Sequence, residues 1–195
     1  DLSKIGFNIC LRGRNKPKLE KVESELKIIN PNIQTRTLVA DFSNAYEEAL
    51  FTQIAEEIKD LDISMLINNA GKFEGKGELQ NKSLDCMKEF LAINSLAPRM
   101  MIKLLTQKML NRNLRSAIIN VGSIAGILPS RYATLYCGSK GFLDKLTASL
   151  KLDFKNNQKN KIDLLILRPC FVSTRMTEYV RIKNFVISPN SCVLG

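Results

Sequence analysis

The chain contains no histidine among its 195 residues. Imidazole is a frequent general acid or base and a common metal ligand, so catalytic schemes and metal sites that need it are excluded for these residues. Cysteine is scarce and scattered, at Cys10, Cys86, Cys137, Cys170 and Cys192, and no two form a Cys-x-x-Cys pair. This spacing argues against a disulfide framework or a zinc site, so we expect no bound metal and a reducing compartment.

Long hydrophobic runs are also absent, and no apolar stretch approaches the roughly eighteen residues that a membrane-spanning helix needs. The first residues, Asp1 to Lys4, include no Met and lack the basic-then-apolar pattern of a signal peptide. We therefore expect residues 1–195 to form one partial dinucleotide-binding and catalytic domain from a larger gene product.

The formal net charge is +10, but the basic residues are spread along the chain rather than clustered. Such spacing favours solvated helix faces, with a phosphate-bearing ligand or an acidic lipid as the alternative. No recognition motif and no group of aromatic stacking residues accompanies the charge, so we expect no nucleic-acid partner.

Short apolar runs alternate with longer amphipathic stretches, which predicts an α/β fold with a parallel sheet and helices on both faces. Pro98 is expected to kink the longest helix. Expected strands are 7–11, 35–39, 63–67, 117–121 and 162–167; expected helices are 17–29, 44–58 (capped by Ser43), 83–111, 134–154 and a last one opening near Ser188.

Tyr136 and Lys140 stand four residues apart, which places them on one face of the expected helix. A nearby fixed cation favours the phenolate and lowers the pKa of a tyrosine, which makes the phenol a plausible general acid for carbonyl reduction. Taken alone, a Tyr and a Lys at this spacing more often lie on a solvent-exposed helix face without a catalytic role. The context of the pair changes this interpretation, because Ser123 and Asn68-Asn69-Ala70-Gly71 follow predicted strands at the sheet edge where such folds bind ligands.

With these motifs the sequence resembles the short-chain dehydrogenase/reductase family along essentially its whole length. The resemblance implies a Rossmann-type, doubly wound sheet and hydride transfer between a nicotinamide and a carbonyl or alcohol. The motifs that carry it are Asn68-Asn69-Ala70-Gly71, Asn94, Gly122-Ser123, Tyr136-x-x-x-Lys140 and Arg168-Pro169 with Thr174 beyond.

The resemblance implies four catalytic residues. Tyr136 would protonate the carbonyl oxygen, and Lys140 would lower the pKa of Tyr136 and hold the nicotinamide ribose. Ser123 would hydrogen-bond the same carbonyl. Asn94 would position a water between Lys140 and solvent.

The resemblance also implies contacts to the cofactor. Asn69, Ala70 and Gly71 would line it, Asp41 would meet the adenine edge, and Pro169, Val172 and Thr174 would lie near the carboxamide. Singly, several of these positions have a simpler structural reading: Asp41 as a turn former, Asn94 as a helix-surface residue, Ser123 as a helix cap and Thr174 as a loop hydroxyl.

Arg12 and Arg14 flank the end of the first expected strand, where no carboxylate is present. An acidic residue at this place would bind a ribose 2′-hydroxyl, whereas arginine accommodates a 2′-phosphate. We therefore predict NADP(H) over NAD, with two merely solvated arginines as the alternative.

Finer features resemble the very-long-chain 3-oxoacyl-CoA reductase and 17-beta-hydroxysteroid dehydrogenase branch: Cys170 followed by Phe171-Val172, Gly126-Ile127-Leu128-Pro129, Asp41-Phe42 and Ser188-Pro189. This branch implies reduction of a 3-oxoacyl-CoA in fatty-acid elongation, or of a steroid ketone, at the endoplasmic reticulum membrane. A cytoplasmic location is the alternative, with membrane contact only through segments outside these residues. Analogy with the family also implies a homodimer.

One departure from the family pattern concerns the start of the chain. Family members begin with a central strand and a Gly-x-x-x-Gly-x-Gly turn that binds pyrophosphate, whereas the first residues here resemble the end of the helix that follows it, and we expect no such glycine turn in this chain. We therefore expect the first strand and its glycine-rich turn to be lacking. The alternative function is a catalytically silent scaffold, or a truncated fragment, that binds a nucleotide or a protein partner.

Overall fold

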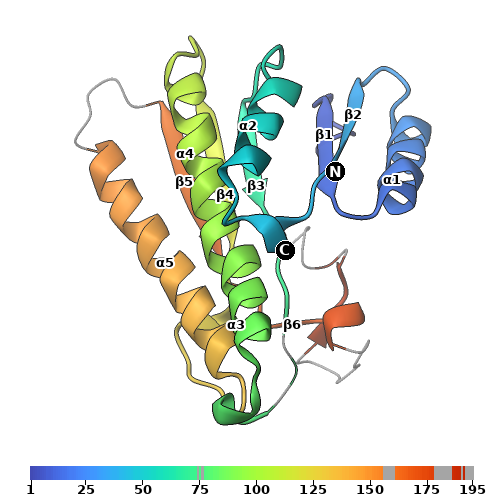
Figure 1. Cartoon of the computed structure of the whole chain (residues 1–195). Helices are drawn as coiled ribbons and strands as arrows, with labels where there is room; N and C mark the ends of the chain where they lie inside the picture. Colours follow the sequence, from blue (N-terminus) through green and yellow to red (C-terminus); the bar gives the residue numbers. More distant parts are fainter. Residues whose placement is uncertain (74, 76, 156–160, 178–185, 190, 192–195) are drawn as a thin grey trace. The chain divides into compact units, whose positions relative to one another are not determined.

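We describe the fold from a computed structural model that covers residues 1–73, 75, 77–155, 161–177, 186–189 and 191. Internal contacts group the chain into two compact units, residues 1–61 and residues 62–195. Figure 1 labels the elements of both units.

Residues 1–61 form a two-stranded parallel sheet with helices. Strand β1 (Ile9–Gly13) pairs with β2 (Thr35–Val39), and α1 (Lys16–Ile29) connects them. The Asn15 side chain accepts a hydrogen bond from the Lys18 N–H at 2.9 Å, which caps α1. Helix α1 buries Leu19 and contacts both strands.

Two boundaries in this unit differ from the prediction. The first strand begins at Ile9, two residues later than expected, because the Phe7 N–H closes a turn onto the Leu2 carbonyl. Ser43 does not cap the next helix, since Asp41 instead caps a short 3₁₀ turn, η1 (Phe42–Asn44). Helix α2 (Glu48–Glu57) then begins four residues later than predicted, with Phe51 and Ile54 buried.

Residues 62–195 contain the larger sheet, in the order β3-β4-β5. Its parallel strands are β3 (Met65–Asn68), β4 (Ser116–Val121) and β5 (Ile162–Leu167). Leu66, Ile118 and Leu164 share one register row and are all buried. Helices α4 (Ala97–Leu110) and α5 (Thr134–Lys155) contact these strands, as Figure 1 shows. Parallel strands joined through helices confirm the predicted α/β class.

Strands β1 and β2 form one hydrogen-bonded sheet, and β3, β4 and β5 form another. The expected lack of a first strand and its glycine-rich turn stays a prediction.

The longest predicted helix is not continuous. Helix α3 (Leu84–Leu91) leads into one π-helical turn, η3 (Ala92–Leu96), before α4 begins. In this turn the Ala97 N–H donates to the Ala92 carbonyl, five residues back. Pro98 has no N–H and cannot donate to the Asn94 carbonyl, so the predicted irregularity takes the form of a π turn around Asn94.

The C-terminal part of the described chain contains smaller elements. Helix α5 matches its prediction within one residue. Short 3₁₀ turns η2 (Leu79–Asn81), η4 (Ile124–Gly126) and η5 (Arg175–Thr177) lie in the connections, and β6 (Phe171–Val172) pairs with β7 (Val186–Ile187). The Ser188 hydroxyl accepts from the Ser191 N–H, as a helix cap does, but most of that predicted helix lies outside the described residues.

None of the helices that the structure describes is long and apolar enough to span a membrane.

Candidate active site

Tyr136 and Lys140 both project from the first two turns of α5. The Lys140 Nζ lies 5.7 Å from the centroid of the Tyr136 ring. Lys140 is only 5% exposed, and its ammonium donates to the Val121 carbonyl at 2.7 Å. The end of β4 therefore anchors the cation beside the phenol, as the four-residue spacing predicts.

Burial changes the acid–base chemistry of Lys140. Loss of solvation lowers its pKa from 10.5 to about 8, because the charged form is disfavoured away from water. An ammonium has three N–H donors, and the Val121 carbonyl takes one of them. Lys140 can therefore offer further donors to hydroxyl groups while remaining a cation near neutral pH.

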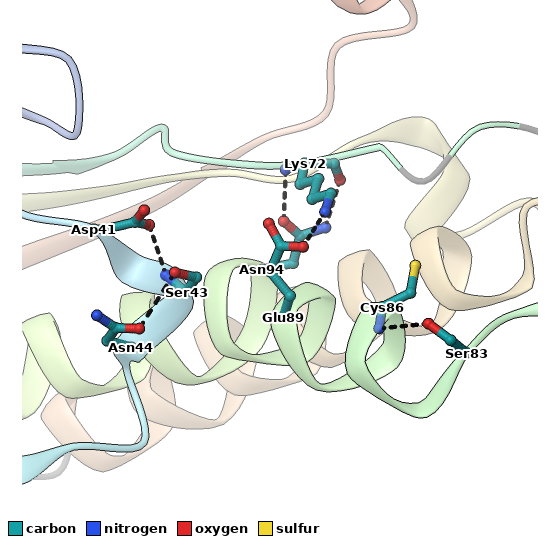
Figure 2. A network of polar contacts seen from close by, with 8 residues as sticks. All are labelled: Asp41, Ser43, Asn44, Lys72, Ser83, Cys86, Glu89 and Asn94. Carbon is teal, nitrogen blue, oxygen red and sulfur yellow. Dashed lines mark hydrogen bonds and ion pairs between the residues drawn. The ribbon is translucent and has the colours of Figure 1, made fainter.

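Asn94 is buried at 2% exposure and lies in the π turn. Its Oδ1 accepts from the Lys72 N–H at 2.8 Å, and its Nδ2 donates to the Lys72 carbonyl at 2.8 Å. Figure 2 shows this reciprocal pair. The second Nδ2 hydrogen reaches the Ser139 hydroxyl at 3.3 Å. Asn94 thus joins the segment after β3 to α5, and its predicted role in positioning water stays a prediction.

Gly71 lies beside both Asn94 and Lys140. A Cβ at Gly71 would stand 3.7 Å from the Asn94 Oδ1 and 3.7 Å from the Lys140 Nζ. The structure therefore brings the end of the Asn68–Gly71 motif to the Tyr–Lys group. Asn69 and Ala70, which precede Gly71, are exposed.

Ser123 follows β4 and begins the η4 turn. Its hydroxyl accepts from the Ala125 N–H at 3.2 Å, so it acts as a cap here, and it is 6% exposed. The η4 turn packs directly on α5, since a Cβ on Gly126 would lie 2.8 Å from the Lys140 carbonyl carbon. This backbone contact ties the turn that starts at Ser123 to the helix that carries Tyr136 and Lys140.

A buried polar chain lies beneath this group, and the sequence analysis missed it. The Asn68 Nδ2 donates to the Asn120 Oδ1 at 2.8 Å, and the Asn120 Nδ2 donates to the Thr147 hydroxyl at 2.8 Å. The Thr147 hydroxyl in turn donates to the Leu143 carbonyl at 2.7 Å. These bonds fasten β3, β4 and α5 together. An asparagine inside the apolar run 117–121 was the available signal, because a buried amide needs partners.

Two further neighbours were also missed. The Phe73 ring packs against the Tyr136 ring with centroids 5.3 Å apart and planes at 87°. The Lys72 ammonium forms an ion pair with Glu89 of α3 (Figure 2). No periodic pattern marks Lys72 or Phe73, since both lie in an irregular segment.

The residues beyond β5 that are predicted to contact the cofactor are held by local hydrogen bonds. The Pro169 carbonyl accepts from the Ile124 N–H at 3.2 Å, which links this segment to η4. Thr177, which was not predicted, accepts from the Thr174 N–H at 3.0 Å and donates to the Val172 carbonyl at 2.6 Å. Val172 and Thr174 are therefore held in one turn, while their contact with a cofactor stays a prediction.

The cofactor residues predicted in residues 1–61 have distinct environments. The Asp41 carboxylate accepts from the Ser43 N–H at 2.9 Å, as a turn former does. The Arg12 guanidinium lies 4.1 Å from the centroid of the Phe42 ring, and burial lowers the pKa of Arg12 to about 10. Arg14 is exposed at the end of β1. Of the two arginines, Arg14 is the one accessible to an anion.

One glycine pattern was overlooked. Gly71, Gly75 and Gly77 have the spacing Gly-x-x-x-Gly-x-Gly, but they follow β3 rather than a first strand. In the family pattern the turn leads straight into a helix, whereas here α3 begins at Leu84. The Gly77 N–H donates to the Tyr132 carbonyl at 3.0 Å, so it is already used within the protein.

Comparison with known proteins is consistent with this fold. A family model described as short chain dehydrogenase matches residues 1–184. A short-chain dehydrogenase from Sphingobium yanoikuyae in complex with NADPH has a TM-score of 0.84 at 20% identity, over 98% of this chain and 74% of that one. The parallel strands with the Tyr-x-x-x-Lys helix define a Rossmann-type protein, and the chain belongs to the short-chain dehydrogenase family.

Two curated relatives indicate the branch of the family. A very-long-chain 3-oxoacyl-CoA reductase from Coccidioides immitis (strain RS) is 37% identical over 151 residues, which are 76% of this chain and 42% of the relative. Hydroxysteroid dehydrogenase-like protein 1 from Gallus gallus is 31% identical over 183 residues, which are 93% and 53% of the two chains. These names confirm the predicted resemblance to that branch. The chain spans about half the length of the curated relatives it matches.

Proposed function

We propose that the protein is an NADPH-dependent reductase that converts a ketone to an alcohol by hydride transfer. The observation that carries the proposal is the buried Lys140 ammonium, held beside Tyr136 by the Val121 carbonyl. A silent scaffold has no chemical need for a buried cation next to a phenol. Burial of an amine is costly, so its retention here favours a catalytic role.

In this mechanism Tyr136 donates its phenolic proton to the carbonyl oxygen as that oxygen gains negative charge. The Lys140 cation stabilises the phenolate that remains, because opposite charges attract strongly where water is scarce. Ser123 donates a hydrogen bond to the same oxygen and polarises it. A bound reduced nicotinamide supplies the hydride.

The residues in the described chain fit parts of such a cofactor. Lys140 has donors that suit ribose hydroxyls, and Gly71 beside it leaves the backbone open to close approach. Arg14, exposed at the end of β1, suits a 2′-phosphate, which favours NADPH over NADH. Arg12, whose guanidinium lies over the Phe42 ring, is the second candidate for this contact.

The substrate we propose is a 3-oxoacyl-CoA of fatty-acid elongation, in line with the name of the relative from Coccidioides immitis. A steroid ketone is the second candidate, because another relative is named a hydroxysteroid dehydrogenase-like protein. Location at the endoplasmic reticulum membrane and a homodimer complete the proposal by family resemblance. Cell fractionation and light scattering test these two parts separately.

The test of function is an assay of nicotinamide oxidation by the protein in its full length. NADPH or NADH is supplied with either 3-oxohexadecanoyl-CoA or a steroid ketone such as estrone. We expect turnover with NADPH and the acyl-CoA, and slower turnover with the other combinations. Absence of turnover with both ketones and both nucleotides, from protein that is folded, would contradict the proposal.

A further inference from the structure

The contact between Phe73 and Tyr136 places an aromatic ring against the proposed general acid. The two rings meet nearly at right angles, with centroids 5.3 Å apart. This edge-to-face arrangement is attractive beyond simple burial. Tyr136 lies in the first turn of α5, and both rings are half-buried. A neighbour that limits rotation of the Tyr136 ring keeps its hydroxyl within hydrogen-bond reach of a substrate oxygen.

Phe73 lies in a segment without regular secondary structure, so its position depends on what holds the chain beside it. The preceding residue, Lys72, is fixed at three points. Its N–H and its carbonyl each bond the Asn94 side chain at 2.8 Å, and its ammonium pairs with Glu89. Figure 2 shows the contacts of Lys72 with both Asn94 and Glu89. The Lys72 and Glu89 side chains are 32% and 34% exposed, so solvent screens their attraction only in part.

The position of Tyr136, the other ring of the pair, also depends on the side-chain amide of Asn94. The Asn94 Nδ2 donates to the Ser139 hydroxyl at 3.3 Å, and the Ser139 hydroxyl donates to the Tyr136 carbonyl at 2.9 Å. Both backbone segments that carry the two rings are therefore tied to Asn94. The buried Asn94 side chain thus sets the distance between these two segments, and the contact between the Phe73 and Tyr136 rings follows from that distance.

We propose that Phe73 is a positioning residue for Tyr136, and that the ion pair between Lys72 and Glu89 keeps Phe73 in place. The proposal rests on the proposed role of Tyr136 as general acid. Phe73 acts through the phenol of Tyr136, so its removal should slow the chemical step more than it weakens binding of the cofactor.

The first test is kinetic and uses the full-length protein with NADPH and 3-oxohexadecanoyl-CoA. We expect Phe73→Leu to lower kcat about three- to tenfold, the range of one aromatic pair, with the KM for NADPH unchanged. Phe73→Tyr retains an aromatic edge and should restore most of kcat. Phe142→Leu is the matched control, because Phe142 is an exposed aromatic farther along α5. Equal kcat in Phe73→Leu and wild type would overturn the proposal.

The second test concerns the ion pair. Lys72→Met and Glu89→Gln should each lower kcat, as Phe73→Leu does. Neither should lower kcat further when Phe73→Leu is already present, because the effects of coupled residues are not additive. Lys59→Met is the control, since Lys59, which follows the end of α2, forms an exposed ion pair with Glu56 inside that helix. Losses that add in full to that of Phe73→Leu would contradict this part of the proposal.

A third measurement tests, without turnover, the ring contact on which the positioning role depends. Tyrosine labelled with ¹³C at Cζ gives an NMR signal for Tyr136, assigned by its loss in Tyr136→Phe. We expect Phe73→Leu to move this signal, while Phe142→Leu leaves it in place. An unmoved signal would overturn the positioning role. If wild-type protein lacks turnover, the proposed function fails, and the labelled signal still decides whether the Phe73 ring lies against Tyr136.

Discussion

At the scale of single residues, Lys140 is the group whose chemistry the fold changes most clearly. Its pKa falls from 10.5 in the unfolded chain to about 8 in the folded protein. Between these two values the unfolded chain binds more protons than the folded protein, so the free energy of unfolding rises as the pH rises. Below about pH 8 the full penalty of burying the ammonium remains.

This argument gives a prediction for stability in the absence of cofactor. Between pH 8 and pH 10.5, the two pKa values of Lys140, the free energy of unfolding of the wild-type protein should rise. This rise should exceed that of Lys140→Met by on the order of 3 kcal/mol. Chemical denaturation at several pH values measures the difference. Parallel stability curves for the two proteins would show that the Lys140 pKa is not depressed by folding.

Arg14 provides a second residue-scale prediction, on cofactor choice. Arg14→Glu removes the exposed guanidinium that is expected to bind a 2′-phosphate. It also introduces a negative carboxylate, which repels the negative phosphate. The ratio of kcat/KM for NADPH to that for NADH should fall by about ten- to a hundredfold, the value of a hydrogen bond to a charged group. Lys16→Glu, a neighbouring exposed change of equal charge, should alter the ratio little. An unchanged ratio in Arg14→Glu would leave the choice of NADPH without its main support.

How far the sequence predicts this site differs from residue to residue. Tyr136 and Lys140 were predictable because helical spacing alone places them on one face, and the structure places Lys140 beside the phenol. Lys72 and Phe73 were not predictable, because their partners Glu89 and Tyr136 are remote in sequence. Contacts made by irregular segments depend on tertiary packing, and periodicity carries no information about them.

At the scale of elements, the contact between η4 and α5 decides whether Ser123 stays attached to the helix that bears Tyr136. This contact requires glycine at position 126, since a Cβ there would lie 2.8 Å from the Lys140 carbonyl carbon and 2.9 Å from its oxygen. Gly138, on α5, has nothing within 4 Å of the place where its Cβ would stand.

The two glycines therefore predict opposite outcomes of the same substitution. Gly126→Ala should destabilise the protein by about 1–3 kcal/mol through steric overlap with rigid backbone, and should lower kcat by displacing Ser123. Gly138→Ala should stabilise it by about 0.5–1 kcal/mol, because alanine loses less backbone entropy in a helix. Thermal denaturation of both variants measures this contrast. Similar shifts in the same direction would contradict the close packing of η4 on α5.

Sequence reasoning succeeded at this scale where periodicity was strong. The ends of β2, β5 and α5 agree with prediction within a residue, since apolar patterns and turn residues bracket them. The stretch 83–111 was read as one kinked helix, whereas the chain forms a π turn around Asn94. Pro98 signalled an irregularity, but the type of turn depends on the hydrogen bonds that Asn94 makes to Lys72 and Ser139.

At the scale of the whole molecule, the chain carries the family's proposed reacting group within residues 62–195. Asn94, Gly71, Tyr136 and Lys140 are linked there by direct contacts, and Ser123 is attached through η4. The strands of residues 1–61 form a separate sheet. The α/β class was predictable from the alternation of apolar runs and amphipathic stretches, whereas the division into two compact units reflects contacts that no local pattern encodes.

The central claim is that Tyr136 is the proton donor in reduction of a ketone. The most direct measurement compares wild type with Tyr136→Phe in single-turnover oxidation of NADPH by 3-oxohexadecanoyl-CoA, together with the Kd for NADPH of each protein. We predict that Tyr136→Phe binds NADPH as wild type does but reacts at least about a hundredfold more slowly, because general acid catalysis contributes at least that much. Equal single-turnover rates in the two proteins would contradict the claim.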